Sequence, residues 1–190
     1  MTEPAETPKA LAPGVFPPEA VELDGFHLRR PTLDDAQALH EAIKASFAEL
    51  LQWMPWCTEP VRIEQQREFL APNAADWASQ AAYNYLIIDA GNHLIGTVSL
   101  MDRIGPGGLE IGYWLRTDAT GRGVMTRAVA RLTDIALGLP GVERVEIHCD
   151  TTNVRSAAVP RRLGYRLDRE EHREPVAPGE SGLGQFWITP

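Results

Sequence analysis

Residues 110–126 read EIGYWLRTDATGRGVMT, an apolar strand pattern followed by a short loop that holds Gly121 and Gly123. The loop opens a helical pattern at Val124. The first turn of a helix has backbone N–H groups without intrahelical acceptors, and the helix dipole adds roughly half a positive charge there. Two glycines allow the backbone to approach a ligand closely. The stretch therefore predicts an anion site, with a phosphate or pyrophosphate as the expected anion.

The hydrophobic pattern on both sides of this stretch predicts strands and helices in a mixed order. Upstream it predicts a strand over 21–30, a helix over 33–54, a helix over 63–81 interrupted at Pro72-Asn73, and strands over 83–89, 94–100 and 109–115. Downstream it predicts a helix from Val124 that stops at 138–141, a strand over 143–149, a helix over 156–163, and strands over 165–173 and 184–188. This order is typical of an α+β domain, a mixed sheet covered by helices.

The composition favours one globular domain and argues against some partners. The 190 residues are 44% hydrophobic and 23% charged, an ordinary globular balance. A formal net charge of −8 argues against nucleic acid, because binding to a phosphate backbone requires a clustered basic surface. Five prolines within residues 1–20 predict a disordered N-terminal arm, so the single domain is expected over 21–190.

Cysteine usage and hydropathy indicate the compartment. Cys57 and Cys149 lie far apart and lack metal-ligand spacing. A disulfide framework, a zinc site or another bound metal is therefore not expected, and a cytoplasmic location is. No apolar run approaches the roughly 20 residues of a membrane helix, so no membrane partner is expected. The oligomeric state stays open at this point, a homodimer included.

Several segments together resemble the GNAT N-acetyltransferases, and within them the RimJ/RimL-like branch of protein N-terminal acetyltransferases. These segments are Leu28–Pro31, Leu51–Trp56, Glu110–Leu115, Gly121–Thr126, Asn153–Ser156 and Leu163–Tyr165. The loop of the family usually reads Gln/Arg-x-x-Gly-x-Gly/Ala, whereas Thr120 stands at its first position here and Met125 at its last. The resemblance covers about residues 21–190. It implies the GNAT fold, a mixed and mostly antiparallel sheet flanked by helices, with acetyl-CoA as co-substrate.

The resemblance also implies roles for residues around the loop. The backbone of Gly121, Arg122, Gly123, Val124, Met125 and Thr126 would bind the pyrophosphate of CoA. Trp114, Leu115 and Arg116 would run alongside the pantetheine arm, and Asn153 would contact the far side of the cofactor. Ser156 or Tyr165 would lie near the sulfur and supply a proton to the departing thiolate, although Ser156 could equally cap the following helix.

Acetyl transfer to an amine requires the amine in its neutral form. A lysine amine with a pKa of ~10.4 is neutral about once in 2,500 molecules at pH 7, whereas an α-amine near ~7.8 is neutral roughly one time in seven. Glu110 is the leading candidate for the base, because it opens the strand beside the cofactor and resembles a general-base glutamate of the superfamily. Glu146 and His148 share one strand face and are the alternatives on the acceptor side.

Trp53 and Trp56 are the candidates for contact with the acceptor, because they follow the first helix, where proteins of the resembled family line the acceptor site. These tryptophans either contact the acceptor or belong to the core. The acceptor is a protein N-terminal α-amine or a small-molecule amine, attacked directly in a ternary complex because the motif segments hold no obvious nucleophile. A second hypothesis is a CoA-binding module without transferase activity, in a regulatory or scaffolding role.

Overall fold

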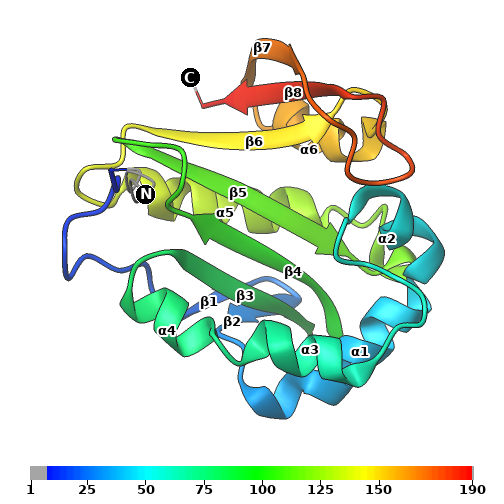
Figure 1. Ribbon diagram of the computed structural model, residues 1–190. Coiled ribbons are helices and arrows are strands. Elements are labelled where there is room, and N and C mark those ends of the chain that lie inside the picture. The colour runs from blue at the N-terminus through cyan, green and yellow to red at the C-terminus, as the bar shows by residue number, and fades with distance from the viewer. Residues whose placement is uncertain (1–7, 190) are drawn as a thin grey trace, which may run out of the picture.

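Eight strands form one sheet in the order β1-β2-β3-β4-β5-β6-β8-β7. The computed structural model describes residues 8–189 (Figure 1). The strands are β1 (Ala20–Leu23), β2 (Phe26–Arg29), β3 (Ala82–Asp89), β4 (Leu94–Met101), β5 (Gly108–Leu115), β6 (Arg144–Asp150), β7 (Arg166–His172) and β8 (Leu183–Ile188). Every neighbouring pair is antiparallel except β5 and β6, which are parallel. The predicted mixed, mostly antiparallel sheet is confirmed.

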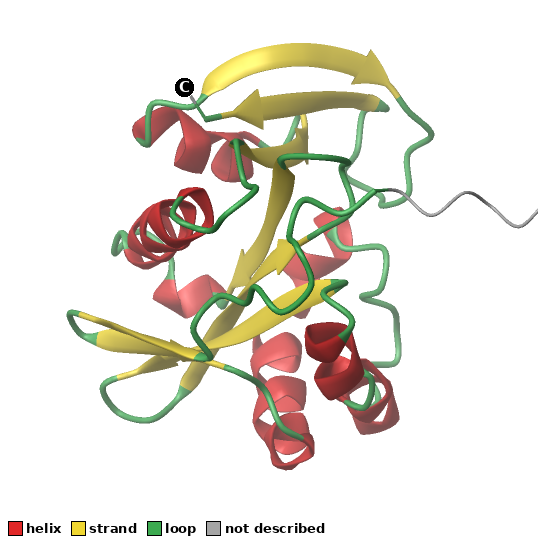
Figure 2. Cartoon of the chain, turned by 90° about the vertical axis from the view of Figure 1, so that its left-hand side faces the viewer, coloured by secondary structure: helices red, strands yellow, loops and turns green. Residues whose placement is uncertain are grey.

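Helices cover both faces of the sheet (Figure 2). They are α1 (Ala36–Ala45), α2 (Phe47–Trp53), α3 (Ile63–Leu70), α4 (Asn73–Ala78), α5 (Val124–Leu137) and α6 (Val154–Arg162), with short 3-10 turns η1 (Leu33–Asp35) and η2 (Thr117–Ala119). Ile87 of β3 packs in the same cluster as the buried face of α5, whereas its neighbour Leu86 packs with α1. Because successive strand side chains point to opposite faces, α5 and α1 lie on opposite sides of the sheet.

The single strand predicted over 21–30 is wrong, because this segment forms the hairpin of β1 and β2. Val21 pairs with Leu28, and the chain reverses at Asp24-Gly25. Gly25 has φ +80°, a left-handed conformation that glycine adopts without steric cost. The apolar positions change phase at this point, from Val21 and Leu23 to Phe26 and Leu28, and Asp24-Gly25 is a turn signal that the prediction of one strand did not use.

The single helix predicted over 33–54 is also wrong, because it breaks at Ser46 into α1 and α2. Ser46 has φ −122° and ψ 14°, and its hydroxyl accepts a hydrogen bond from the Thr117 N–H at 3.0 Å. This contact joins the α1–α2 junction to the segment between β5 and α5. The predicted interruption of the next helix is confirmed, since α3 ends at Leu70 and α4 begins at Asn73.

The described part of the N-terminal arm lies against the domain, which differs from the expectation of disorder. The backbone N–H groups of Ala10 and Leu11 donate to the carboxylate of Asp102 at 2.8 and 3.1 Å, and all three residues are buried. Residues 8–19 form no helix or strand, as the prolines predict. A buried acceptor far away in sequence fixes the segment instead. Residues 1–7 of the predicted arm lie outside the described residues.

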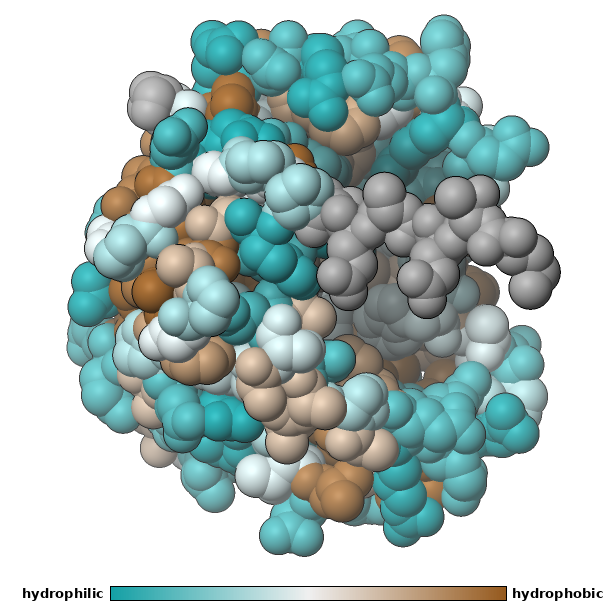
Figure 3. Space-filling view, turned by 60° about the vertical axis from the view of Figure 1, so that its left-hand side comes forward, coloured by the Kyte–Doolittle hydropathy of each residue, from teal (hydrophilic) through white to brown (hydrophobic). Residues whose placement is uncertain are grey.

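Strands β5 and β6 separate after a short pairing, and this separation creates the functional site. Their register covers only three pairs, from Gly108–Arg144 to Glu110–Glu146. Beyond them, Ile111 to Leu115 of β5 has no strand partner on its β6 side within residues 8–189. Figure 3 shows a mostly hydrophilic face that is hollowed between the upper and lower parts of the molecule. None of the helices in residues 8–189 has the length and apolar character to span a bilayer.

Candidate active site

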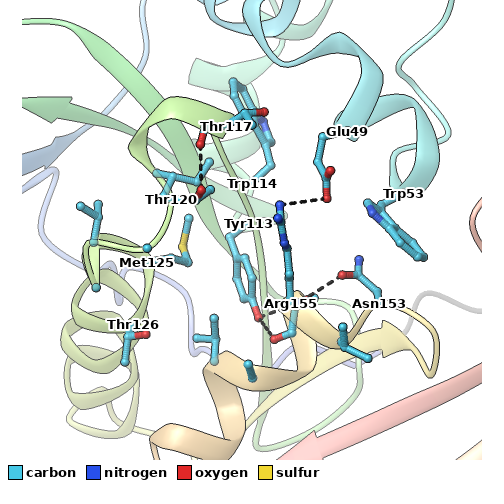
Figure 4. Close-up of a pocket in the computed structure, with 18 of the residues that line it drawn as sticks. Glu49, Trp53, Tyr113, Trp114, Thr117, Thr120, Met125, Thr126, Asn153 and Arg155 are labelled. Carbon is cyan, nitrogen blue, oxygen red and sulfur yellow. Dashed lines mark hydrogen bonds and ion pairs between the residues drawn. The ribbon is translucent and has the colours of Figure 1, made fainter.

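A first cleft of about 800 Å³ opens between α2, the end of β5, the glycine loop and the start of α6 (Figure 4). Trp53 of α2 and Trp114 of β5 contribute its aromatic surface. Arg155 of α6 extends across the cleft to Glu49 of α2, with an N–O distance of 3.5 Å. This ion pair connects the two walls of the cleft.

The glycine loop supplies the anion-binding part of the first cleft. Gly121 and Gly123 have φ of +74° and +72°, and no atom lies within 4 Å of the position that a Cβ would occupy on either. Among residues 8–189, no acceptor bonds the backbone N–H groups of Val124, Met125 and Thr126, the first turn of α5. The loop therefore offers open space over unpaired donors at a helix N-terminus, which fits a phosphate or pyrophosphate.

A second cleft of about 780 Å³ lies on the other side of the separated strands. It is lined by side chains of β4, β5, β6 and α3 and by the segment between β7 and β8. Six residues line both clefts, namely Trp53, Met54, Tyr113, Trp114, Asn153 and Ser156. The two clefts therefore meet where β5 passes the start of α6, and a molecule in one can touch a molecule in the other.

Two hydroxyl groups stand at this junction. The Tyr113 hydroxyl donates to the Ser156 carbonyl oxygen at 2.9 Å, and the Ser156 hydroxyl lies 3.3 Å from the same Tyr113 oxygen. Burial raises the pKa of Tyr113 above its usual value, so the phenol keeps its proton at neutral pH. The Asn153 side chain accepts from the Ser156 N–H at 3.1 Å. Asn153 rather than Ser156 is thus the cap of α6, which corrects the capping role considered for Ser156.

A chain of charged groups extends from the wall of the second cleft into the protein. Both oxygens of Glu110 accept from Arg103, each at 2.8 Å, and Glu110 Oε2 lies 3.6 Å from Nδ1 of His148. His148 Nε2 is 2.8 Å from Glu146, which also accepts from Arg144 at 2.8 Å. The parallel register places Glu110 directly beside Glu146. Burial acts to raise the pKa of Glu146, but the hydrogen bonds from Arg144 and His148 outweigh it and lower the pKa.

The structure brings most of the sequence-predicted site residues to the two clefts. The first cleft alone is lined by Leu115, Gly121, Gly123, Val124, Met125 and Thr126, the second alone by Trp56, Glu110 and His148, and both by Trp53, Trp114, Asn153 and Ser156. Trp56 is 45% exposed, so the alternative that it belongs to the core is wrong. Glu146 is buried behind His148 and reaches the second cleft only through it.

Three of the predicted residues lie elsewhere. Arg116 pairs with Asp118, and Arg122 donates to the Asp118 carbonyl, so neither side chain lines a cleft. Tyr165 is buried in the core, where its hydroxyl lies 2.6 Å from that of Thr133. Burial raises the pKa of Tyr165 to about 12. The resemblance to the family implied a place for Tyr165 near the sulfur, but the chain after α6 directs its side chain into the cluster that contains α5.

Several residues of the site were not identified from the sequence. Tyr113 lies within one of the segments that resemble the family, but no role was predicted for it, although it supplies one of the two hydroxyls at the junction. Strand alternation relative to Glu110 could not place it, because both clefts open along the same strand. Arg103 and the pair of Glu49 and Arg155 depend on contacts between separate elements, for which the local sequence carries no signal.

Comparisons with known proteins agree with this geometry. Residues 26–166 match the family described as "Acetyltransferase (GNAT) domain". The Bacillus subtilis (strain 168) protein named "Putative ribosomal N-acetyltransferase YdaF" is 32% identical over 137 residues, which is 69% of this chain and 72% of that protein. Because the family match covers most of the chain, the protein belongs to the GNAT acetyltransferase family, and this relative supports the RimJ/RimL-like branch.

Solved structures share the fold at lower sequence identity. The microcin C7 self-immunity acetyltransferase MccE, in complex with acetyl-CoA and AMP, superposes with a TM-score of 0.80 at 23% identity, covering 88% of this chain and 93% of that one. RimL, a ribosomal L7/L12 α-N-protein acetyltransferase in complex with coenzyme A, has a TM-score of 0.78 at 24% identity, covering 92% and 97%. The predicted GNAT fold, acetyltransferase activity and acetyl-CoA co-substrate are confirmed by the family match together with these likenesses.

Proposed function

We propose that this GNAT acetyltransferase acetylates the α-amine at the N-terminus of a protein, by direct attack on acetyl-CoA bound in the first cleft. The observation that carries the proposal is the meeting of two clefts at Tyr113, Asn153 and Ser156. A donor in one cleft and an acceptor in the other would present their reacting groups to each other at that junction. This arrangement favours a ternary complex.

The first cleft suits acetyl-CoA for two reasons. The unpaired N–H groups of the loop and of the first turn of α5 match a pyrophosphate. The edge of β5 from Ile111 to Leu115, free of a strand partner toward β6, offers N–H and C=O groups to the amides of a pantetheine arm. In this assignment acetyl-CoA supplies the thioester, and the residues of this chain bind it and orient its acetyl group toward the junction.

Direct attack is favoured over a covalent acetyl-enzyme. Cys149 is the only thiol that lines either cleft among the described residues. Burial raises the pKa of its thiol, which reduces the fraction of nucleophilic thiolate at neutral pH. The amine nitrogen of the acceptor would then form a bond with the carbonyl carbon, and the carbon–sulfur bond would break. The acetyl group would thus pass directly from sulfur to nitrogen, without an acetyl-enzyme intermediate.

Glu110 is proposed to receive the proton that the amine loses. Its carboxylate lies on the second cleft and has about four lone-pair sites, of which Arg103 occupies two. The remaining sites can accept from an ammonium group or from a bridging water. His148 is the proposed neighbour in this transfer, because its Nδ1 lies 3.6 Å from Glu110 while Glu146 holds its other nitrogen. The ring is thereby fixed in orientation.

Tyr113 and Ser156 are proposed to serve the sulfur side of the reaction. The thiolate that leaves needs a proton, and both hydroxyls stand where the clefts meet. A CoA thiol has a pKa near ~8.5, so its thiolate is a tolerable leaving group and a donor adds a modest factor, on the order of tenfold. Either hydroxyl could also donate to the carbonyl oxygen as it gains negative charge.

The choice of an α-amine as acceptor rests on chemistry and on relatives. An α-amine is neutral far more often than a lysine amine at pH 7, so a carboxylate already engaged by Arg103 suffices as base. The names of two similar proteins, YdaF and RimL, describe ribosomal N-acetyltransferases, which supports a protein N-terminus. Acidic lining in the second cleft favours a positively charged acceptor.

The test is release of free CoA from acetyl-CoA with different acceptors. The set comprises peptides with free N-termini, the same peptides with a blocked N-terminus and an internal lysine, spermidine, and an aminoglycoside. The proposal expects turnover with free N-termini and at least 100-fold less with the blocked peptides, a factor set by the difference in neutral amine. Preferred turnover of blocked peptides, spermidine or the aminoglycoside would contradict the proposed acceptor.

A further inference from the structure

Three large apolar side chains are exposed at the opening of the second cleft. Trp56, Phe69 and Val176, here called the rim cluster, are 45%, 44% and 59% exposed, and all three line this cleft. They come from the chain after α2, from α3 and from the segment between β7 and β8. Only eight large apolar residues in the described part of the chain are exposed, and three of these eight lie together at this one opening.

Trp56 of the rim cluster rests on a buried residue beneath it. The Trp56 ring packs on the Trp114 ring with centroids 6.3 Å apart and an angle of 54° between the planes. Trp114 is buried and lies at the junction of the two clefts. The indole of Trp56 is thus ordered before any acceptor arrives, and a ligand that covers it avoids part of the entropic cost of ordering.

The interior below the rim cluster is acidic. Three poorly exposed carboxylates line the interior, those of Glu110, Asp150 and Glu180, against two guanidinium groups, those of Arg103 and Arg173, while the exposed carboxylate of Glu68 lies at the opening. The guanidinium groups are already paired, with Glu110 at 2.8 Å and with Glu180 at 2.7 Å. The Asp150 carboxylate accepts from the hydroxyls of Thr152 and Ser181 and forms no ion pair within residues 8–189. The excess charge in the cleft is therefore negative.

An acidic interior and an apolar rim select different parts of one molecule. The interior attracts an ammonium group. The rim cluster is removed from water only if an apolar group lies near that ammonium group in the same molecule. A polyamine or an aminoglycoside can place an ammonium group in the acidic interior but has no bulky apolar group to cover the rim cluster. An acidic peptide meets Glu68, which neighbours Phe69 on α3.

We propose that the second cleft selects N-termini whose first two residues carry a bulky apolar side chain and no carboxylate, with the α-ammonium in the acidic interior and the apolar side chain on the rim cluster. This inference rests on the proposed function, because it assumes a free α-amine as acceptor. It adds the side-chain preference, which the family assignment does not contain.

Peptide series that differ only at residue 2 test the preference. Phe, Ser and Asp at this position, behind an identical first residue, isolate the contact with the rim cluster. We expect kcat/KM for the Phe peptide to exceed that for the Ser peptide about tenfold, as expected for burying part of an aromatic side chain, and the Asp peptide to be the poorest. Equal values for all three would overturn the preference and leave the acetyltransferase activity standing.

Binding gives a readout that does not depend on turnover. Titration of each peptide into CoA-saturated protein, followed by calorimetry, should show the same order of affinity. If the protein binds the peptides in this order and acetylates none, the preference holds and the proposed activity fails. If affinity is equal across the series, or if spermidine binds more tightly than the Phe peptide, the preference is overturned.

The variants Trp56→Ser and Phe69→Ser assign the preference to the rim cluster. Each should reduce the Phe-to-Ser ratio of kcat/KM to within about threefold, because the apolar contact that distinguishes the two peptides is lost. Leu137→Ser is the matched control, since Leu137 is 41% exposed on α5 and lines neither cleft. A control that lowers the ratio equally, or rim variants that keep it near tenfold, would overturn the assignment.

Discussion

The Tyr113 hydroxyl donates to the Ser156 carbonyl oxygen at 2.9 Å, and this bond joins β5 to α6 at the point where the two clefts meet. Forty-three positions separate the two residues along the chain. The bond fixes the distance between the strand that borders both clefts and the helix whose first turn borders the first cleft. A bond between two distant elements therefore fixes the junction, and two hydroxyls lie there.

Replacing Tyr113 with Phe should lower kcat roughly tenfold and leave the KM for acetyl-CoA within about twofold, because a proton donor is lost while the ring remains. Steady-state kinetics on the CoA-release reaction give both constants. Tyr165→Phe is the matched control, since it also loses a buried hydroxyl contact, to Thr133, but lines neither cleft. Each variant should lose about 1 kcal/mol of unfolding free energy. Equal kcat values for the two variants would exclude a role for the Tyr113 hydroxyl.

Glu110→Gln should lower kcat by about 100-fold or more, because the amide cannot accept the proton of the amine. Arg103→Gln provides the complementary measurement: it frees both oxygens of Glu110. We expect the KM for the acceptor to fall, because the ammonium no longer competes with the guanidinium. A Glu110→Gln enzyme with unchanged kcat and an unchanged pH profile would show that the base is another group.

The glycine loop should bind acetyl-CoA, and Gly123→Ala should weaken this binding. At 100-fold excess over its dissociation constant, acetyl-CoA should add ~2.7 kcal/mol to the unfolding free energy of the native protein, seen as a rise in Tm. Gly123 has φ +72°, so alanine there costs about 1 kcal/mol and shifts the donors of the first turn. Gly25→Ala, with φ +80° and the same open space, controls for the strain. It should lose similar stability and keep its affinity for acetyl-CoA, as calorimetry can show.

The ion pair of Glu49 and Arg155 should affect binding more than folding. The side chains of Arg155 and Glu49 are 67% and 43% exposed, so Glu49→Gln should change the unfolding free energy by less than ~1 kcal/mol. The same change removes a negative charge from the first cleft, and acetyl-CoA should bind about two- to fivefold more tightly at low salt. The gain should shrink at 0.5 M salt, where screening is strong. Arg155→Gln should act in the opposite direction; tighter binding by both variants would contradict the electrostatic explanation.

Asp150 should contribute stability that depends on pH. Burial acts to raise the pKa of Asp150, but hydrogen bonds from Thr152 and Ser181 outweigh it and hold the pKa well below its usual range. A depressed folded pKa stabilises the protein above the unfolded value of about 3.9, and this contribution is lost as the pH falls toward the folded pKa. The free energy of unfolding of Asp150→Asn should therefore be about 1–3 kcal/mol lower than that of the native protein at pH 7. This difference in unfolding free energy should become smaller below about pH 4. Urea unfolding at a series of pH values measures it.

The sequence was informative where the relevant contacts are local. The strand–loop–helix junction at 110–126 was predicted because glycines at positive φ and unpaired N–H groups follow from a few neighbouring residues. The predicted bounds of β3, β4 and β5 and the start of α5 agree with the structure to within one residue, because hydrophobic pattern and the turn residues between these elements are both local. The break at Ser46 could not be predicted in this way, because its partner, the Thr117 N–H, is 71 positions away.

By itself, therefore, the sequence determined the donor: a loop that presents N–H groups to an anion, in the residue order of one family. Only the tertiary structure decided the acceptor side. Glu110 meets Arg103 and His148, Trp56 meets Trp114, and Tyr113 meets Ser156 because separate segments pack together around β5, which parts from β6 after three pairs. A backbone donor site depends on conformation that short segments encode, whereas a cleft of side chains depends on how distant elements pack, which no local pattern specifies.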